Sequence, residues 1–377
     1  MRILIVTEYY PESINAPMKG GVESRSFYVT QNLSKANEVS VICSYQKDQK
    51  RFDTVGNVKV YRVGKIHPYT NKGSIFTRLN FASSAYKKGK SLKENFDVVE
   101  GYNFISYLPA YYIGKYKKAK KIATYHEVWV GEWVKNKGLI TGTFGSIWER
   151  RVLSLKWDKI ISVSEFTKKK LEKFYDKEKI VVVPNGIELQ KYNNIQSNNN
   201  KFPTISCVAR LIPQKKVDDL IKAIALLKKE YPNIKCKIVG SGDEMKNLKA
   251  ITKKLSLEDN IEFLGFIEKH EDVLSIIKSS DVFVLPSILE GFGIAVIEAM
   301  ALNVPYVATR IPPIVEVTNN GVGGLLFEPE NVKELAKNIK KLLNDKELLD
   351  KKRKESKEFV KRYDWEIIIQ KLKEIYR

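Results

Sequence analysis

Short β-branched segments alternate with stretches of helical length along the whole of this 377-residue sequence. RILIVT, EVSVIC and DVVEGY are three such segments in the first half, and TISCVAR, CKIVGS and DVFVLP are three in the second. Apolar strands of this kind, separated by amphipathic helices, are typical of parallel sheets that are covered on both faces. The sequence therefore predicts an α/β protein with two doubly wound, Rossmann-like domains.

An asparagine-rich segment, QKYNNIQSNNNKFP at 190–203, separates the two sets of strands and shows neither helical nor strand periodicity. The chain is also longer than one hydrophobic core usually organises. We therefore expect an N-terminal domain over 1–190, a linker over 191–203 and a C-terminal domain over 204–360. Residues 361–377 are predicted to form a C-terminal helix that packs back on the N-terminal domain.

The sequence lacks the usual signals of membrane-spanning and metal-binding proteins. No apolar run reaches the roughly 18 residues that span a bilayer, and MRILIVTEYY is typical of a buried first strand rather than a signal peptide. Cys43, Cys207 and Cys236 lie in separate strand-like runs, which indicates reduced core thiols. HExxH, CxxC and DxD patterns are absent. We therefore expect a cytoplasmic protein without a metal site.

Basic residues are in excess, mainly in the first half of the chain. The net charge is +21, and residues 1–190 contain 33 Lys or Arg against 18 Asp or Glu. Such an excess suits nucleic acid, an anionic membrane or a phosphorylated substrate, although a lysine-rich proteome produces the same value without any partner. Because the basic residues are dispersed and no RNA-binding motif interleaves them with aromatics, we expect no nucleic-acid partner.

The segment at 281–310 carries the most chemical information. The apolar strand DVFVLP is followed by a turn with two glycines and then by a helix. Amides at such a helix start bind a diphosphate or sugar oxygens. Glu290 before the turn and Glu298 on the helix are both able to face the carboxyl edge of the sheet, where carboxylates accept hydrogen bonds from hydroxyl groups. Two glutamates at this spacing are common, so the spacing alone is weak support.

A second segment, CVARLIPQKKVDDLIKA at 207–223, places a strand before Arg210 and a helix after Val217. Arg210 and Lys215 lie five residues apart across one loop. Together they are able to neutralise a diphosphate leaving group without a metal ion. Either residue alone would more often be a solvated surface cation.

SILEGFGIAVIEAMA and VARLIPQKK resemble the Glu-x7-Glu signature and the G-R-L-x-x-x-K-G element of the large family of retaining GT-B glycosyltransferases that is numbered 4. The resemblance implies two Rossmann-like domains facing across a cleft. It also implies that Glu290 reaches hydroxyls of the donor sugar, that Glu298 binds the nucleotide ribose, and that Arg210 and Lys215 grip the diphosphate. Lys216 replaces the family's usual glycine and is an alternative to Lys215 as the phosphate ligand.

The resemblance assigns four residues around the glycine turn to donor phosphate and sugar: Gly291, Phe292, Gly293 and Ile294. It also implies that the loop with Phe266 and Ile267 lies near the base.

Two N-terminal motifs extend the resemblance. Gly20 and Gly21 match the family's G-G-x-E loop near the donor phosphates and the acceptor. His126 ends ATYH, which matches a T-x-H element whose histidine lies near the anomeric carbon. A lone histidine is usually structural, but one at the tip of a parallel strand faces the ligand edge. His67 and His270 have no comparable context, and we assign them no role.

One departure from the family pattern is the pair Pro312-Pro313, which replaces glycines and predicts a stiffer loop.

The expected protein is a metal-independent, hexosyltransferase-type enzyme without a cofactor. It would move a sugar from a UDP- or GDP-linked donor to a glycan, lipid-linked or small-molecule acceptor in cell-surface glycan synthesis, with retention at the anomeric carbon. A GT-B sugar-nucleotide epimerase or phosphorylase is the alternative within enzymes, because these share the architecture. A basic nucleic-acid-binding protein is the more distant alternative.

Two basic clusters, at 111–121 and 139–157, suggest an anionic partner for the N-terminal domain. In the second cluster Trp148 and Trp157 accompany a pair of arginines, a combination that suits the headgroup boundary of a membrane. In the alternative interpretation the tryptophans fill the core and the lysines only solvate the surface. We expect peripheral docking on the inner face of an anionic membrane.

Overall fold

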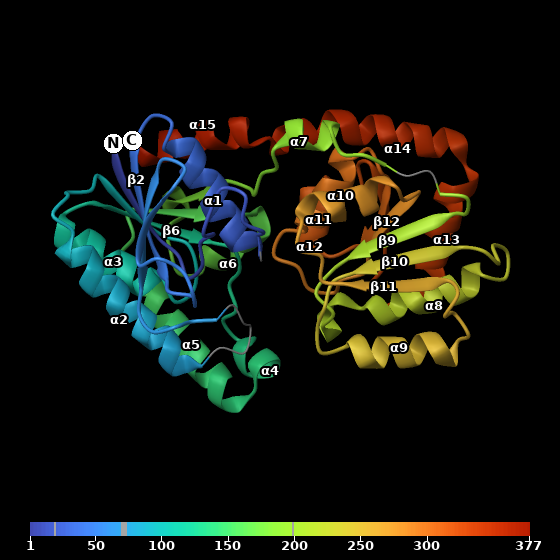
Figure 1. Ribbon diagram of the computed structural model, residues 1–377, viewed down its shortest axis with the longest axis horizontal. Coiled ribbons are helices and arrows are strands. Elements are labelled where there is room, and N and C mark those ends of the chain that lie inside the picture. The colour runs from blue at the N-terminus through green and yellow to red at the C-terminus, as the bar shows by residue number, and fades with distance from the viewer. Residues whose placement is uncertain (19, 69–73, 198–199) are drawn as a thin grey trace. The chain divides into compact units, whose positions relative to one another are not determined.

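The structure is a computed structural model that describes residues 1–18, 20–68, 74–197 and 200–377. It contains two sheets of mainly parallel strands, each covered by helices (Figure 1). The predicted α/β class with two Rossmann-like domains is confirmed. Because the central strands are apolar on both faces, each sheet is stable only when helices cover both sides.

The chain divides into two compact units, with Met1–Asn185 and Glu366–Arg377 in unit 1 and Gly186–Trp365 in unit 2. The division therefore falls before the expected linker at 191–203. Tyr192 shows why, because its side chain is buried in the core of unit 2 and holds this stretch against that unit.

The described residues of unit 1 form an eight-stranded sheet of order β3-β4-β2-β1-β5-β6-β7-β8, in which β3 is antiparallel to β4 and the other strands pair in parallel. The central strand β1 is buried from Ile3 to Val6. The strands are β1 (Arg2–Val6), β2 (Glu38–Ser44), β3 (Phe52–Val55), β4 (Val58–Val63), β5 (Val98–Gly101), β6 (Lys120–Tyr125), β7 (Lys159–Ser162) and β8 (Ile180–Val182).

The described helices of unit 1 are α1 (Gly21–Leu33), α2 (Ile75–Ser91), α3 (Tyr107–Lys117), α4 (Trp133–Lys137), α5 (Leu139–Leu153), α6 (Glu165–Leu171) and, from its second residue on, α15 (Trp365–Tyr376). Two of these helices, α2 and α6, have N-cap serines. The hydroxyls of Ser74 and Ser164 accept hydrogen bonds from backbone amides in the first turn of each helix. At the far end of the chain, the Tyr376 hydroxyl on α15 donates a hydrogen bond to the buried Glu100 carboxylate on β5.

Unit 2 has a six-stranded parallel sheet of order β11-β10-β9-β12-β13-β14. The strand order reverses between β9 and β12, which are paired in the middle of the sheet. The strands are β9 (Thr204–Val208), β10 (Lys235–Val239), β11 (Ile261–Gly265), β12 (Val282–Leu285), β13 (Tyr306–Thr309) and β14 (Gly324–Phe327).

The helices of unit 2 are α7 (Leu189–Asn193), α8 (Val217–Leu227), α9 (Met245–Lys254), α10 (His270–Lys278), α11 (Ile294–Ala301), α12 (Pro312–Val317), α13 (Val332–Asn344) and α14 (Lys346–Phe359). The apolar residues of α8 recur every three or four positions and are buried. Among the described residues, no helix combines the length and the apolar character that crossing a bilayer requires.

Pro312 and Pro313 form the first turn of α12 rather than the stiff loop that we expected. Proline suits this position because the first amides of a helix have no partner within the helix.

Candidate functional site

The loops after β9 and β12 meet at the carboxyl edge of the unit 2 sheet. Their strands are neighbours at the point where the strand order reverses. In open α/β sheets this switch point is where ligands bind. The two loops are joined directly, because the Ile288 amide donates a hydrogen bond of 2.9 Å to the Gln214 carbonyl.

An ion pair connects the two loops at this edge. Lys215 Nζ lies 2.6 Å from Glu290 Oε1, and the two side chains are only 14% and 13% exposed. Both residues were predicted site residues, but their mutual contact was not predicted. Low exposure strengthens a charge-assisted hydrogen bond of this kind. The pair brings a cation for phosphate and an acceptor for hydroxyl groups to one place.

Lys216 has a different environment from Lys215. Its backbone is left-handed, with a φ of 46°, and its Nζ pairs with Glu330. A left-handed backbone favours glycine, which is the residue that the resembled G-R-L-x-x-x-K-G element has at this position. Lys215, rather than Lys216, therefore shares the switch point with Glu290.

Arg210 is exposed and makes no ion pair with any residue that the structure describes. Its loop is supported by the loop after β10, which approaches it closely through two glycines. A Cβ on Gly240 would lie 1.9 Å from the Ala209 carbonyl oxygen, and one on Gly242 would lie 2.2 Å from that of Leu211. The Gly-x-Gly pair of this loop thus permits backbone packing that positions Arg210.

Glu298, on α11, is held by two residues that the sequence did not indicate. Its Oε1 accepts hydrogen bonds from His270 Nε2 at 2.9 Å and from the Tyr192 hydroxyl at 3.3 Å. Burial lowers the pKa of His270, but the charge and hydrogen bond of Glu298 outweigh this effect and raise the pKa overall. No sequence signal could have found these contacts, because their partners are far apart in the chain and belong to no shared motif.

The glycine turn before α11 contributes backbone rather than side chains. Gly293 has a φ of 88°, and a Cβ there would lie 2.4 Å from Ile314 Cδ1, so that glycine is required. Phe292 is buried and packs edge-on against Tyr363. Only the amides of Gly291 to Ile294 are therefore suited to contact a ligand.

The loop after β11 presents an aromatic side chain to solvent. Gly265 has a φ of 70°, Phe266 is exposed, and Ile267 packs partly against the core of unit 2. An exposed phenyl ring offers a surface on which a base is able to stack. The predicted role near the base stays a prediction.

His126 directly follows β6, at the carboxyl edge of the unit 1 sheet. Burial, and secondarily the positive charge of Arg25, lower its pKa to about 3. Its Nε2 is buried and has no hydrogen-bond partner among the described residues. The imidazole is therefore neutral near pH 7 and has an unused ring nitrogen.

Gly20 and Gly21 lie at the start of α1. Gly20 has an extended backbone, and a Cβ on Gly21 would meet no atom within 4 Å, so packing does not explain the glycine at Gly21. One turn later, the buried Arg25 Nη1 donates hydrogen bonds to the Pro184 carbonyl at 2.7 Å and to Asn185 Oδ1 at 3.0 Å. These bonds fix the start of α1 to the end of the first chain segment of unit 1.

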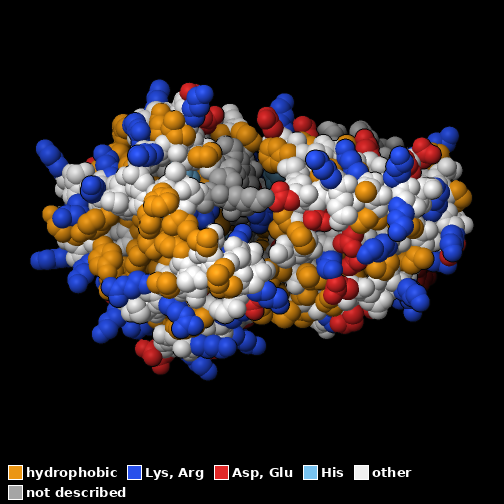
Figure 2. Space-filling view, turned by 90° about the horizontal axis from the view of Figure 1, so that it is seen from below, with side chains coloured by type: hydrophobic (Ala, Val, Ile, Leu, Met, Phe, Trp, Pro, Cys, Tyr) orange, Lys and Arg blue, Asp and Glu red, His pale blue; other side chains and the backbone are white. Residues whose placement is uncertain are grey.

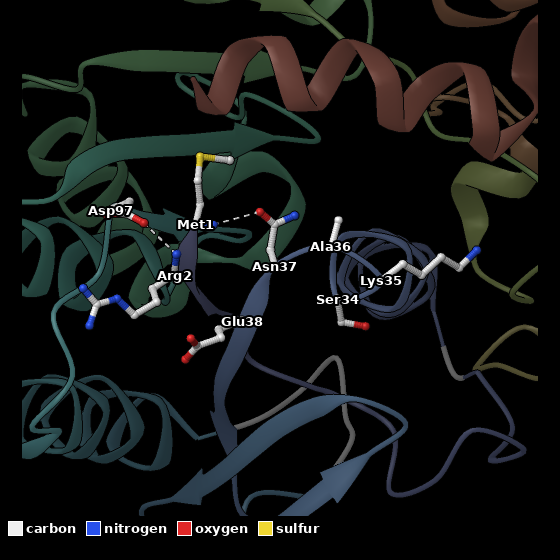
Figure 3. A pocket seen from close by; sticks show the side chains of 8 residues that line it. All are labelled: Met1, Arg2, Ser34, Lys35, Ala36, Asn37, Glu38 and Asp97. Carbon is white, nitrogen blue, oxygen red and sulfur yellow. Dashed lines mark hydrogen bonds between the residues drawn. The ribbon is translucent and has the colours of Figure 1, made fainter.

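A hollow of about 440 Å³ lies at the opposite, amino edge of the unit 1 sheet (Figure 3). Asp97 Oδ2 accepts a hydrogen bond from the Arg2 amide at 2.6 Å, and Asn37 Oδ1 accepts one from the Met1 ammonium at 3.2 Å. Because ligands of parallel sheets bind at the carboxyl edge and these groups are already paired, we assign this hollow no role in catalysis.

The three cysteines are buried and free. Burial raises the pKa of Cys43 and of Cys207 to about 12, so neither is a reactive thiol near pH 7. Within the described part of the chain, no group of three or more His, Cys, Asp or Glu is arranged to hold a metal ion.

Two family models match consecutive parts of the sequence. The model described as glycosyl transferases group 1 matches residues 190–359, and the model described as Glycosyltransferase Family 4 matches residues 19–191.

Individual relatives agree with these models. An uncharacterized glycosyltransferase of Haemophilus influenzae is 34% identical over 58% of this chain and 61% of its own length. One from Methanocaldococcus jannaschii is 27% identical over 100% of this chain and 98% of its own. The gpi3 subunit of the Schizosaccharomyces pombe phosphatidylinositol N-acetylglucosaminyltransferase is 24% identical over 96% of this chain and 78% of its own.

Solved structures share the fold over the whole chain. Sucrose-phosphate synthase from Thermosynechococcus elongatus superposes with a TM-score of 0.83 at 19% identity, covering 100% of this chain and 98% of that one. An Anabaena protein solved with UDP-glucose superposes with a TM-score of 0.76 at 16% identity, covering 100% and 99%.

Proposed function

Because this chain belongs to the GT-B glycosyltransferases of the family 4 type, we propose that it is a retaining hexosyltransferase that uses a nucleotide-diphosphate sugar. The acceptor would be a glycan, a lipid-linked molecule or a small molecule of cell-surface glycan synthesis. The observation that carries the proposal is the meeting of Lys215 and Glu290 at the switch point of unit 2, with the exposed Arg210 in the same loop as Lys215.

The donor would bind to unit 2 in a defined orientation. Arg210 and Lys215 bind the diphosphate oxygens, and Glu290 accepts hydrogen bonds from hydroxyls of the sugar. Glu298 accepts hydrogen bonds from the ribose, and His270 holds its carboxylate in place. UDP or GDP would be the nucleotide, and UDP is supported by the fold neighbour that was solved with UDP-glucose.

Bond exchange would occur at the anomeric carbon. The acceptor oxygen forms its bond on the face from which the bond to the donor phosphate breaks, and the nucleoside diphosphate leaves with the bonding electrons. Arg210, Lys215 and the amides before α11 stabilise the negative charge that develops on the departing diphosphate. The neutral His126 is suited to accept a hydrogen bond at the reacting sugar.

Two measurements test this proposal. Thermal unfolding against UDP, GDP and ADP sugars identifies the donor, since a ligand of the folded state raises the unfolding temperature. Nucleoside diphosphate release from that donor should then require an acceptor, and the product should keep the anomeric configuration. An epimerised nucleotide sugar without release would indicate an epimerase. Phosphate-dependent formation of a sugar 1-phosphate would indicate a phosphorylase. Either result contradicts the proposal.

We also propose that unit 1 docks on an anionic membrane. Figure 2 shows hydrophobic side chains gathered on the face of unit 1 that carries α2, α4 and α5, with Lys and Arg around them. Exposed apolar residues of these helices are Phe76, Val134, Leu139, Ile140 and Ile147. Phe76 and Ile140 are each 82% exposed.

The charge on these helices favours an anionic partner. The helices α2, α3 and α4 contain no acidic residue, and the acidic residue of α5, Glu149, is buried and bonded to Trp129 and Trp133. Each basic residue near an anionic leaflet contributes about 1 kcal/mol.

The tryptophan part of the sequence prediction is wrong. Trp157 is buried in the core, and Trp148 is partly buried with its Nε1 donating to the Phe104 carbonyl at 2.9 Å. Their large rings gain more from packing against the unit 1 core than from facing solvent. Aliphatic side chains of α5 therefore supply the exposed apolar surface.

Vesicle sedimentation tests the docking. Phosphatidylglycerol vesicles should bind the protein at low salt and release it as salt rises, whereas phosphatidylcholine vesicles should not bind it. Ile140→Ser with Ile147→Ser should weaken binding, and Leu226→Ser, at an exposed position of unit 2, is the matched control. Unchanged binding by the double variant would contradict the proposed surface.

A further inference from the structure

The switch point of unit 1 holds a cluster of charged and polar side chains to which the sequence analysis assigned no role. This point lies between β1 and β5, which are neighbours in the sheet. Glu8 follows β1 and Asn103 follows β5, while His67 follows β4 and Arg78 lies in the first turn of α2. Four segments that are distant in sequence thus bring hydrogen-bonding groups to one place at the carboxyl edge.

Glu8 is the centre of this cluster. Its Oε1 accepts hydrogen bonds from His67 Nε2 at 2.9 Å and from Arg78 Nε at 3.1 Å, and its Oε2 accepts one from Asn103 Nδ2 at 3.2 Å. The Ser106 hydroxyl donates a hydrogen bond of 2.5 Å to Asn103 Oδ1 and so holds the amide of Asn103 in place. A buried carboxylate with donors on both oxygens has a fixed position, and it fixes the position of its donors.

Arg78 is the member of the cluster that is open to a ligand. Glu8 contacts its Nε, whereas Nη1 and Nη2 form no hydrogen bond with any residue in the described part of the chain. The side chain is 22% exposed. The two Nη groups of a guanidinium form a planar fork that matches two oxygens of an anion. Because Glu8 already orients the fork, binding an anion loses little side-chain entropy.

We propose that Arg78, oriented by Glu8, binds a phosphoryl group of the acceptor, so that the acceptor is a phosphate-bearing molecule. The proposal rests on the transferase function and specifies its acceptor class. A phosphate, with up to two negative charges, gains more than a carboxylate from this basic unit, whose residues 1–190 contain 33 Lys or Arg against 18 Asp or Glu. The bonds that His67 and Asn103 donate to Glu8 reduce the repulsion between Glu8 and the phosphate.

Calorimetric titration tests the assignment, with saturating UDP present to occupy the diphosphate site of unit 2. The probes are α-D-glucose 1-phosphate, monomeric dihexanoyl phosphatidylinositol, methyl α-D-glucoside and L-malate. At least one of the two phosphorylated probes should bind, and methyl α-D-glucoside should not. Tighter binding of glucose 1-phosphate would identify a soluble acceptor, and tighter binding of the phosphatidylinositol would identify a lipid-linked one.

Variants locate the binding. Arg78→Gln should weaken binding of the phosphorylated probe about tenfold or more, as expected for charged hydrogen bonds. Arg78→Lys keeps the positive charge but not the planar pair of Nη groups, so it should lose an intermediate amount of binding affinity. This variant also provides the test if Arg78→Gln folds poorly. Lys47→Gln removes an equal charge from the exposed loop after β2 and should change binding less than twofold.

Four results would overturn the proposal: binding of neither phosphorylated probe, an unchanged affinity in Arg78→Gln, an equal loss in Lys47→Gln, or tighter binding of L-malate than of both phosphorylated probes. Failure of UDP to bind would count instead against the donor site of unit 2. The same titration without UDP would still report on Arg78, so the two failures are distinguishable.

Discussion

The two sheets carry opposite charge arrangements at equivalent places. At the switch point of unit 2, Lys215 of one loop pairs with Glu290 of the next, and Arg210, in the same loop as Lys215, has no ion-pair partner among the described residues. At the switch point of unit 1 a glutamate is central and surrounded by donors. Both sheets reverse their strand order in the middle, and this reversal decides where a ligand is able to bind. The loop side chains decide which ligand binds. Two similar sheets thus carry two chemically different clusters of side chains at their switch points.

The largest expected effect concerns the cations of unit 2. Arg210→Gln and Lys215→Gln should each reduce kcat about 100- to 1000-fold, the range for removing one group that stabilises developing negative charge. Lys216→Gln is the matched control, because Lys216 pairs with Glu330 instead. Equal losses in Lys215→Gln and Lys216→Gln would break the distinction between the two lysines.

A smaller loss is expected at His126 in unit 1. His126→Ala should lower kcat by about tenfold to a hundredfold and leave donor affinity unchanged. This loss is no larger than the smallest that is typical of a group that transfers a proton.

The stability of the protein in acid should also depend on His126. Because the pKa of His126 is lowered to about 3, its contribution to stability is fully present above pH 6.5 and is lost as pH falls towards 3. The free energy of unfolding in urea should therefore fall less steeply between about pH 6.5 and pH 3 in His126→Asn than in the wild type. An equally steep decline would contradict a buried, neutral His126.

Donor affinity should respond to Glu298 in unit 2. Glu298→Ala is expected to weaken donor binding by about 1–3 kcal/mol, the range for hydrogen bonds to a charged group. His270→Gln keeps a donor beside Glu298 and should weaken binding less. A donor affinity that is the same in wild type and Glu298→Ala would remove this carboxylate from the site.

A stability effect is expected at Lys216. Lys216→Gly relieves a left-handed backbone at a non-glycine residue but loses the exposed pair with Glu330. We expect a net stabilisation of about 0–1 kcal/mol, measured by urea unfolding. A loss above about 1 kcal/mol would show that the pair with Glu330 matters more than the backbone.

No effect is expected from chelation. If Arg210 and Lys215 neutralise the leaving diphosphate, transfer should continue in excess EDTA. Activity that disappears with EDTA and returns with magnesium would show that the cations of unit 2 are insufficient.

The comparison between sequence and structure separates local from long-range information. Glu290 and Lys215 were predicted because each lies beside a strand end and a helix start, which are local patterns. Their ion pair, and the contact between His270 and Glu298, join residues from different loops and helices and leave no local pattern. The same holds for Glu8, whose donors come from three other segments.

In two places the local sequence pattern suggested one structure, and contacts with distant parts of the chain produced another. The Asn-rich segment lacks periodicity, as a linker does, yet Tyr192 anchors the stretch before it in the unit 2 core. Trp148 and Trp157 lie near arginines in the sequence, as residues at a membrane boundary do. The sequence does not show that α3, α5 and β6 form a core against which both rings pack. Burial of a large ring depends on neighbours that the chain brings together only on folding.

Because α15 belongs to unit 1 but lies at the end of the sequence, unit 1 is completed after unit 2 when the chain is synthesised. Unit 1 includes Glu366–Arg377, and the buried Glu100 accepts a hydrogen bond from Tyr376 in that segment. A ribosome makes residues 186–365 between the two parts of unit 1. The first 185 residues therefore leave the ribosome with the Glu100 carboxylate still lacking this partner, and all of unit 2 is synthesised before unit 1 is able to complete its core.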